Sequence, residues 1–420
     1  MKIIILFNLN DYLGGGEVLL LRIAERFKEK DIKFIIIGSY GNGYITDEAY
    51  NNKYALVRWP YKNSSVCYMN KKERAYVSNY FYKIFSKYHE IYIFTFCFRD
   101  IYNSIIAFKK LENMNVFLST GIFHPNDIRY LSSYSINKKK YLNNNQNVLK
   151  KYVNHKCAIF MNERTLYSTF GYVNTYMYQI IPLPIQMLSS RKNYITKKDS
   201  IFKIIYIGRF VNFKLSSIIM ILNYIKLHPQ DQLTIIGYGN CENIIKSYIK
   251  KHSIKNVNIL GKIHPNELND IILEHDIAYC MGTSALETAK YGIPTIIAPM
   301  LPKNYWRKKM DICLGIFGEN KDFNLGEIDK KNNSKFESLH ICINKIKNNY
   351  QNYQLLTLNH IKNFDLDKIT NQYLNIIQNS NLKISEIEQY FLKAPILKYI
   401  AKKFYYNLKI YKIIKYDYDQ

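Results

Sequence analysis

The sequence predicts an α/β protein that consists of two doubly wound, Rossmann-like domains in tandem. Short, unbroken apolar runs, typical of parallel strands covered on both faces, alternate with segments of helical period. This alternation stops once, at the two prolines of Ile181-Pro182-Leu183-Pro184, and then begins again. With 420 residues, of which 48% are hydrophobic, the chain is long enough to bury two such cores.

The first domain is predicted to span residues 1–188. Its first apolar run is followed by the glycine loop Gly14-Gly15-Gly16-Glu17 and then by an amphipathic segment, which is the order of a βαβ unit. The predicted strands are 3–7, 34–37, 91–96, 116–118 and 158–161, and the predicted helices are 18–27 and 101–111.

The second domain is predicted to span residues 200–345, after the polar run 189–200. Its strands are expected at 203–207, 232–236, 257–260, 277–280 and 295–298, and its helices at 216–227, 241–251 and 265–273. A further helix is expected over 336–350, in the polar stretch that follows residue 320. The repeated strand–helix order again indicates a parallel sheet.

The last region, 346–420, contains a predicted helix over 366–378 and a basic, aromatic segment over 384–416 with a helical pattern. A basic amphipathic helix is typical of a membrane-surface element. A helix packed on the first domain, with its lysines in water, explains the same pattern. Both readings stay open.

The chain carries a net charge of +26, which favours contact with polyanions such as nucleic acid, an anionic membrane or phosphate-bearing substrates. The lysines are dispersed, and none of the common nucleic-acid-binding signatures is present, so a specific nucleic-acid partner is not expected. The seven cysteines form no CxxC pair, which argues against a disulfide framework or zinc site and for a reducing cytoplasm. No apolar run approaches the roughly 20 residues that span a bilayer.

Small residues and charged side chains follow four predicted strands of the second domain, at the sheet edge where open α/β folds bind ligands. Two cations beside small-residue turns suit a diphosphate, because backbone N–H groups and positive charge both attract the anion. A carboxylate at this edge suits hydrogen bonds from sugar hydroxyls. The four groups are Gly208-Arg209 with Lys214, Gly237-Tyr238-Gly239, Gly261-Lys262-Ile263, and Gly282-Thr283-Ser284 with Glu287.

In order, the stretches IYIGRFVNFK, LTIIGYGN, ILGKIHPNELNDII and DIAYCMGTSALETAKYGIPTII resemble the motifs of retaining glycosyltransferases of the GT-B fold, in the glycogen-synthase-like group 1 (family 4 type). The resemblance covers about residues 203–299, and it extends more loosely to the first domain through the GGGE loop, VFLSTGIFHP and IIPLPI. It implies two Rossmann-like domains that face each other across a cleft.

The resemblance also implies roles for the second-domain residues. The cations matching Arg209 and Lys214 grip the donor diphosphate, and the turn matching Gly282, Thr283 and Ser284 donates backbone N–H groups to the distal phosphate. The acid matching Glu287 binds the donor ribose. The remaining expected donor-site positions are Gly208, Gly237 and Ile263, the last of them beside the nucleobase.

The family commonly carries a further acid eight residues before the one that matches Glu287, and here that count falls on Tyr279. The contact to the transferred sugar must therefore differ from the family pattern, and hydroxyl groups such as those of Thr283 and Ser284 are the alternatives. The identity of the donor sugar cannot be deduced from these residues.

The first domain offers a second set of candidates. Gly15 and Gly16 resemble the family's glycine-rich loop near the donor phosphates, although a plain strand-to-helix turn explains them too. His124 follows a predicted strand where related enzymes carry a histidine near the reacting sugar. Asp127 and Arg129, just beyond it, are possible acceptor contacts. Arg99-Asp100 also follows a strand, and there we expect Asp100 to cap a helix.

The expected activity is transfer of a sugar from a nucleotide-diphosphate donor to a glycan or lipid-linked glycan, with retention and without a metal or cofactor. The resemblance and the charge suggest polysaccharide, lipopolysaccharide or capsule biosynthesis in a bacterial cytoplasm, at the inner membrane face. The Asp-x-Asp at 417–419 matches a metal-binding pattern but lies far from any predicted strand end. The alternatives are a nucleotide-sugar 2-epimerase of the same fold and a non-catalytic binding or scaffold protein.

Overall fold

The computed structural model describes residues 1–10, 15–62, 64–132, 138–187, 201–302, 305, 310–320, 322–328 and 336–392. These residues form two compact units, each of which is described by itself. Unit 1 contains residues 1–184 together with the described residues from Asp367 onward, and unit 2 contains residues 185–366. The observed division differs from the predicted one, because the chain returns to unit 1 after Leu366 instead of forming a separate region from 346.

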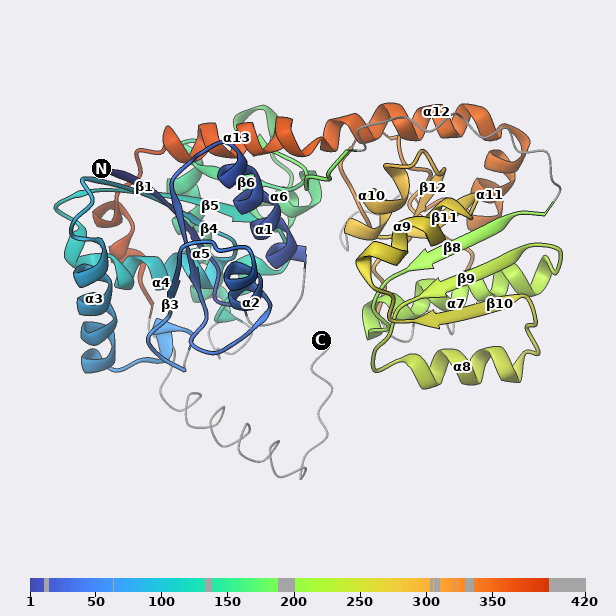
Figure 1. The fold of residues 1–420 in the computed structure, drawn as a ribbon, viewed down its shortest axis with the longest axis horizontal. Coiled ribbons are helices and arrows are strands. Elements are labelled where there is room, and N and C mark those ends of the chain that lie inside the picture. Colours follow the sequence, from blue (N-terminus) through green and yellow to red (C-terminus); the bar gives the residue numbers. More distant parts are fainter. Residues whose placement is uncertain are drawn as a thin grey trace, which may run out of the picture. The chain divides into compact units, whose positions relative to one another are not determined.

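Unit 1 is built on a seven-stranded parallel sheet with the strand order β3-β2-β1-β4-β5-β6-β7 (Figure 1). The strands are β1 (Lys2–Phe7), β2 (Phe34–Gly38), β3 (Leu56–Arg58), β4 (Glu90–Thr95), β5 (Asn115–Ile122), β6 (Ala158–Phe160) and β7 (Gln179–Ile180). The helices are α1 (Gly15–Glu29), α2 (Tyr44–Asn51), α3 (Lys71–Phe85), α4 (Phe98–Ala107), α5 (Lys138–Asn154), α6 (Glu163–Phe170) and α13 (Leu366–Gln378).

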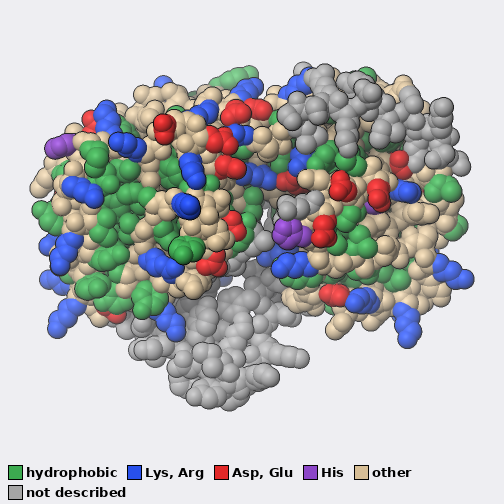
Figure 2. Space-filling view, viewed as in Figure 1, with side chains coloured by type: hydrophobic (Ala, Val, Ile, Leu, Met, Phe, Trp, Pro, Cys, Tyr) green, Lys and Arg blue, Asp and Glu red, His purple; other side chains and the backbone are tan. Residues whose placement is uncertain are grey.

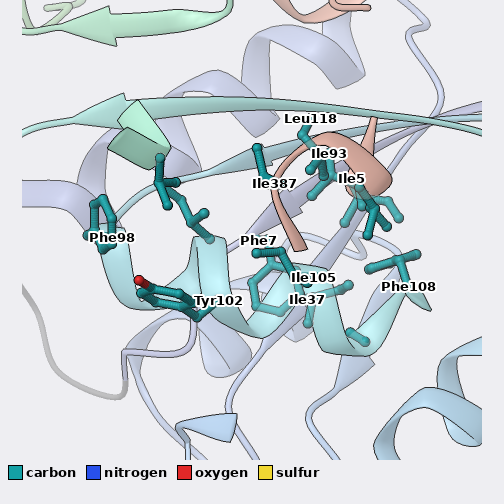
Figure 3. Close-up of a cluster of buried hydrophobic side chains, with 14 of the residues drawn as sticks. Ile5, Phe7, Ile37, Ile93, Phe98, Tyr102, Ile105, Phe108, Leu118 and Ile387 are labelled. Carbon is teal, nitrogen blue, oxygen red and sulfur yellow. The ribbon is translucent and has the colours of Figure 1, made fainter. Parts of the chain in front are cut away.

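The sheet divides the hydrophobic core of unit 1 into two layers, as the side chains of β1 show. Ile3, Ile5 and Phe7 point to one face of the sheet, and Ile4 and Leu6 point to the other, because successive side chains of a strand alternate. All five are buried, which explains why the run 3–7 is apolar without interruption. Figure 3 shows part of the first layer, where α4 packs on the strands.

The segment after α13 also belongs to this core, and here the predicted helix from 384 is wrong over the described residues. Residues 384–386 and 388–390 form two separate 3₁₀ turns. The Leu382 carbonyl accepts the Leu118 N–H at 2.9 Å, and Ile387 is fully buried in the cluster of Figure 3. The rest of the basic segment, and the Asp-x-Asp at 417–419, lie outside the described residues.

Unit 2 is built on a five-stranded parallel sheet with the order β10-β9-β8-β11-β12. The strands are β8 (Lys203–Ile207), β9 (Gln232–Ile236), β10 (Val257–Gly261), β11 (Ile277–Cys280) and β12 (Thr295–Ile297). The helices are α7 (Asn212–Leu227), α8 (Glu242–Lys251), α9 (Pro265–Leu273), α10 (Thr283–Ala289), α11 (Leu339–Asn348) and α12 (Tyr350–Ile361). All five strands lie within one residue of their predicted bounds, whereas α7 begins four residues earlier than predicted.

The positive charge is spread out on the face of the molecule shown in Figure 2. On the face shown in Figure 2, Lys and Arg side chains are distributed over both units with Asp and Glu among them. In the part of the chain that the structure describes, no helix has the length and apolar character needed to cross a membrane.

Candidate active site

The carboxyl ends of β8, β9 and β10 form one hydrogen-bonded edge in unit 2. The Gly208 N–H donates to the Ile236 carbonyl at 2.9 Å, and the Gly237 N–H donates to the Gly261 carbonyl at 2.8 Å. The pairing thus continues beyond the strands into the glycine turns. Ligands bind at this end of the strands in open α/β sheets.

Gly237 is required for this close approach. Its φ is +154°, and a Cβ at this position would collide with the carbonyl oxygen of Gly208. Gly239, with φ +150°, is packed in the same way against the Phe210 backbone. The Gly-Tyr-Gly turn therefore lies directly against the turn that carries Arg209.

Lys214 lies in the first turn of α7, and its ammonium is directed back over the end of β8. Its Nζ is 3.1 Å from the point where a Cβ on Gly208 would be placed. The pKa of Lys214 is lowered to about 8, mainly by burial; the Cys280 thiol at the end of β11 opposes this shift, and the positive charge of Arg209 contributes to it. Lys214 makes no hydrogen bond or ion pair with any described residue. A partly buried cation without a partner is costly, and an anion that bound here would offset the cost.

Arg209 directly follows Gly208 and is exposed. It too forms no hydrogen bond or ion pair within the described ranges. The structure thus places the two predicted cations together at the end of β8, with neither of them neutralised by the described part of the chain.

The turn after β11 is short. Gly282, with φ +64°, is the N-cap of α10, and Thr283 and Ser284 are the first two helical residues. Backbone N–H groups in the first turn of a helix have no acceptor within that helix. The Ser284 hydroxyl donates to the Met281 carbonyl at 2.9 Å, so it is already engaged.

Glu287 lies one turn further along α10 and is partly buried. Lys290, which the sequence reasoning missed, forms an ion pair with it at 2.7 Å. The i, i+3 spacing of the two residues on one helix was the available signal. Ile263 follows β10 and is half-buried. Its predicted role beside the nucleobase, like the ribose role of Glu287, stays a prediction.

Tyr279 lies within the sheet, as the predicted strand 277–280 implied. It is the third residue of β11, fully buried, and its hydroxyl donates to the Ile312 carbonyl at 3.4 Å. Only Met281 and Gly282 separate β11 from α10. The position eight residues before Glu287 therefore lies inside the sheet. The connection between β11 and α10 is too short to present a further acidic side chain at the strand end.

Unit 1 carries its own polar group after β1. The buried Glu17, in the first turn of α1, accepts hydrogen bonds from the side-chain amides of Asn10 at 2.6 Å and Asn8 at 3.4 Å. Gly15 and Gly16 begin α1 instead of lying in a loop as predicted, and a Cβ on either would meet no atom within 4 Å. Packing therefore does not require glycine at these two positions, and their predicted role toward the donor is untested. Gly14 lies outside the described residues.

Arg99 and Asp100 extend this group to the end of β4. Arg99 donates to Asn10 Oδ1 at 3.0 Å and to Asp100 Oδ1 at 3.2 Å. Asp100 is fully buried and accepts the Leu9 N–H at 3.3 Å. It is not the N-cap of α4, as the sequence suggested, because Cys97 occupies that position. Asp100 instead joins the ends of β1 and β4.

His124 and Asp127 follow β5. The Asn126 N–H donates to His124 Nδ1 at 3.0 Å, so the neutral ring carries its proton on Nε2. Desolvation lowers the pKa of His124, which favours this neutral form. Burial also raises the pKa of Asp127 to about 7, and the nearby Asp100 adds to the shift, whereas backbone N–H groups and Arg99 oppose it. Arg129 is exposed beside them.

Across the described residues, no three His, Cys, Asp or Glu side chains lie close enough together to hold a metal ion. The predicted metal independence is untested.

No family model matches the sequence, and no curated protein is significantly similar to it. Solved structures are similar in fold. HepE from Anabaena, in complex with UDP and glucose, gives a TM-score of 0.58 at 14% identity over 90% of this chain and 99% of that one. The lipopolysaccharide outer core galactosyltransferase WaaB gives a TM-score of 0.59 at 12% identity, over 90% of this chain and 99% of that one. A glycosyltransferase from Rickettsia africae gives a TM-score of 0.61 at 15% identity, over 90% of this chain and 97% of that one. With its two parallel sheets covered by helices, the chain has the GT-B fold of these glycosyltransferases.

Proposed function

We propose that this chain is a glycosyltransferase that moves a sugar from a nucleoside-diphosphate donor to a glycan or lipid-linked glycan acceptor. One observation carries the proposal: the partly buried Lys214 ammonium has no partner among the described residues, and it lies with Arg209 at the carboxyl end of β8. Structural neighbours that are glycosyltransferases, some of them solved with UDP or UDP-glucose, support the choice of ligand.

The chemistry that follows is electrostatic. Breaking the bond between the sugar and the diphosphate leaves negative charge on the leaving phosphate. Cations and N–H groups placed before the reaction stabilise that charge more than water does, because they need not reorganise. Lys214 and Arg209 would supply the charge, and the Thr283 and Ser284 N–H groups would supply further donors.

We assign a retaining reaction to the enzyme, with the leaving phosphate taking the acceptor's proton. This assignment rests on the resemblance of the sequence motifs. His124 is assigned a supporting role: because its proton is on Nε2, it donates a hydrogen bond to a sugar hydroxyl and does not act as the base. A divalent metal is not required in this scheme, because the two cations balance the diphosphate.

Polysaccharide or lipopolysaccharide intermediates are the proposed acceptors, and an anionic membrane surface is a proposed partner. Ile384 and Ile387 are buried in the core of unit 1, so we assign the proposed membrane contact to residues 393–416.

The test is a screen of nucleotide sugars with purified protein, read as transfer to an acceptor, hydrolysis or epimerisation. Arg209→Ala and Lys214→Ala should each lower transfer by about two to three orders of magnitude, the range seen when one charge-stabilising donor is removed. Lys226, exposed in the last turn of α7, is the matched control, and Lys226→Ala should leave activity unchanged.

Two outcomes would select the alternatives. Conversion of the donor sugar to its 2-epimer without transfer would indicate the epimerase. If nucleoside diphosphates protect the protein from heat unfolding and none of the nucleotide sugars reacts, the chain is a binding protein. Unchanged activity in both alanine variants would overturn the proposed site.

A further inference from the structure

A buried hydroxyl lies beside Lys214 and has no partner. Tyr206, the fourth residue of β8, is 0% exposed, and its hydroxyl makes no hydrogen bond with any described residue. Its oxygen is 3.2 Å from the point where a Cβ on Gly208 would be placed, and Lys214 Nζ is 3.1 Å from the same point. The hydroxyl and the ammonium therefore flank one glycine.

A buried polar group without a partner destabilises the folded protein, so phenylalanine would suit the position better if only packing mattered. The ring of Tyr206 packs within the hydrophobic core of unit 2, where its centroid is 6.5 Å from that of Tyr279. Packing explains the ring and leaves the hydroxyl unexplained. Burial also raises the pKa of Tyr206, so the hydroxyl stays neutral and keeps a lone pair that can accept a hydrogen bond.

We propose that Tyr206 is a positioning residue whose hydroxyl oxygen accepts a hydrogen bond from the Lys214 ammonium when a diphosphate is bound. This inference rests on the proposed function, since it assigns a second residue to the same site. The lysine stem has four rotatable bonds, which allow its ammonium to turn toward both the hydroxyl and the ligand. A glycine at 208 leaves the space between the two groups open.

The hydroxyl is too deeply buried to touch the ligand itself, so its effect must pass through Lys214. The other ionisable groups that act on Lys214 are Arg209 and the Cys280 thiol, and Cys280 also acts on Tyr206. Both are unchanged in the variant that tests the proposal.

The experiment compares Tyr206→Phe with the full-length protein, using UDP as the probe. Thermal unfolding should show a melting temperature equal to or above that of the wild type, because an unpartnered hydroxyl is lost. The Kd for UDP at pH 8 should nevertheless rise about tenfold, the loss expected for one hydrogen bond to a charged group. The pH above which binding weakens should shift downward, because the charged form of Lys214 loses an acceptor.

Tyr373 supplies the matched control. It is also fully buried with an unpartnered hydroxyl, but it lies in the core of unit 1 beside Phe94 and Phe123. Tyr373→Phe should show the same stability and an unchanged Kd for UDP, so a general effect of removing buried hydroxyls is separated from a local one.

The results distinguish this inference from the proposed function. If Lys214→Ala weakens UDP binding and Tyr206→Phe has the wild-type Kd and pH profile, Tyr206 is a core residue only and the inference is wrong. If neither variant affects binding, the proposed function fails with it. A clear loss of stability in Tyr206→Phe would also overturn the inference, since it would reveal that the hydroxyl has a structural partner.

Discussion

Binding of a nucleoside diphosphate should be accompanied by proton uptake by the protein. The number of protons taken up should follow from the pKa of Lys214. Its pKa of about 8 lies below the ordinary 10.5, mainly because burial disfavours the charged form. A bound diphosphate would favour that form again and raise the pKa. At pH 8.5 only about a quarter of the free protein carries a charged Lys214, whereas nearly all of the complex would. Binding should therefore take up about 0.75 proton at pH 8.5 and only about 0.1 at pH 7.

The number of protons can be measured by titration calorimetry of UDP binding in two buffers with different ionisation enthalpies. At pH 8.5 the terminal phosphate of UDP, with a pKa near 6, is fully ionised, so the uptake belongs to the protein. Lys214→Gln should abolish the uptake and weaken binding. An uptake below about 0.2 proton at pH 8.5, or an equal uptake in the glutamine variant, would refute the reasoning.

The same pKa shift fixes the sign of a stability effect. Because the folded-state pKa of Lys214 is below the unfolded value, the folded protein binds fewer protons between pH 8 and 10.5. Stability from this group therefore rises with pH across that window. Below pH 8 the full cost applies, on the order of 3 kcal/mol. Lys214→Met should accordingly raise the melting temperature at pH 7 while it impairs binding.

Three further changes test other features. Gly237→Ala should destabilise unit 2 by more than about 3 kcal/mol in urea unfolding, because its Cβ collides with backbone; wild-type stability would contradict the close approach of the two turns. Glu287→Ala should weaken UDP binding about tenfold, whereas Glu242→Ala, which removes a similar 2.7 Å ion pair on α8, should leave the Kd unchanged; equal effects would argue against a ribose contact. Truncation after Leu392 should preserve the melting temperature of unit 1, whereas truncation after Asn379 should lower it strongly, since several buried side chains are removed. Membrane flotation of the form truncated after Leu392, compared with the full-length protein, then tests whether the tail binds membrane.

The strands were predictable because their residues are apolar on both faces. The run 203–207 and the run 277–280 needed only a hydrophobic pattern, since a covered parallel strand has no exposed face. Helix α5 was missed for the opposite reason. Its buried face includes Asn145, which accepts from the Tyr102 hydroxyl and donates to the Ile128 and Tyr130 carbonyls. A polar residue whose hydrogen bonds are satisfied by distant partners conceals the helical period.

Parts of the candidate site could also be predicted. The order of glycines and cations after successive strands was sufficient to place Arg209 and Lys214 at one edge of a sheet. The start of α7 could not be predicted, because its N-cap residue, Val211, makes no side-chain hydrogen bond to the helix and so gives no capping signal in the sequence. The unpartnered hydroxyl of Tyr206 was beyond prediction, since hydrogen-bond satisfaction depends on which residues surround the ring after folding.

The path of the chain through the two units has a consequence for the order of events on the ribosome. Unit 2 is continuous in sequence from 185 to 366, so it can fold as soon as that stretch has emerged. Unit 1 begins first but lacks α13 and the buried residues Leu382, Ile384 and Ile387 until about 200 further residues have been made. At a synthesis rate of about 5–20 residues per second, the sheet of unit 1 stays partly uncovered for roughly 10–40 s before these residues are made. The amino-terminal half is thus the last to be completed, and it is the half that chaperones would need to protect.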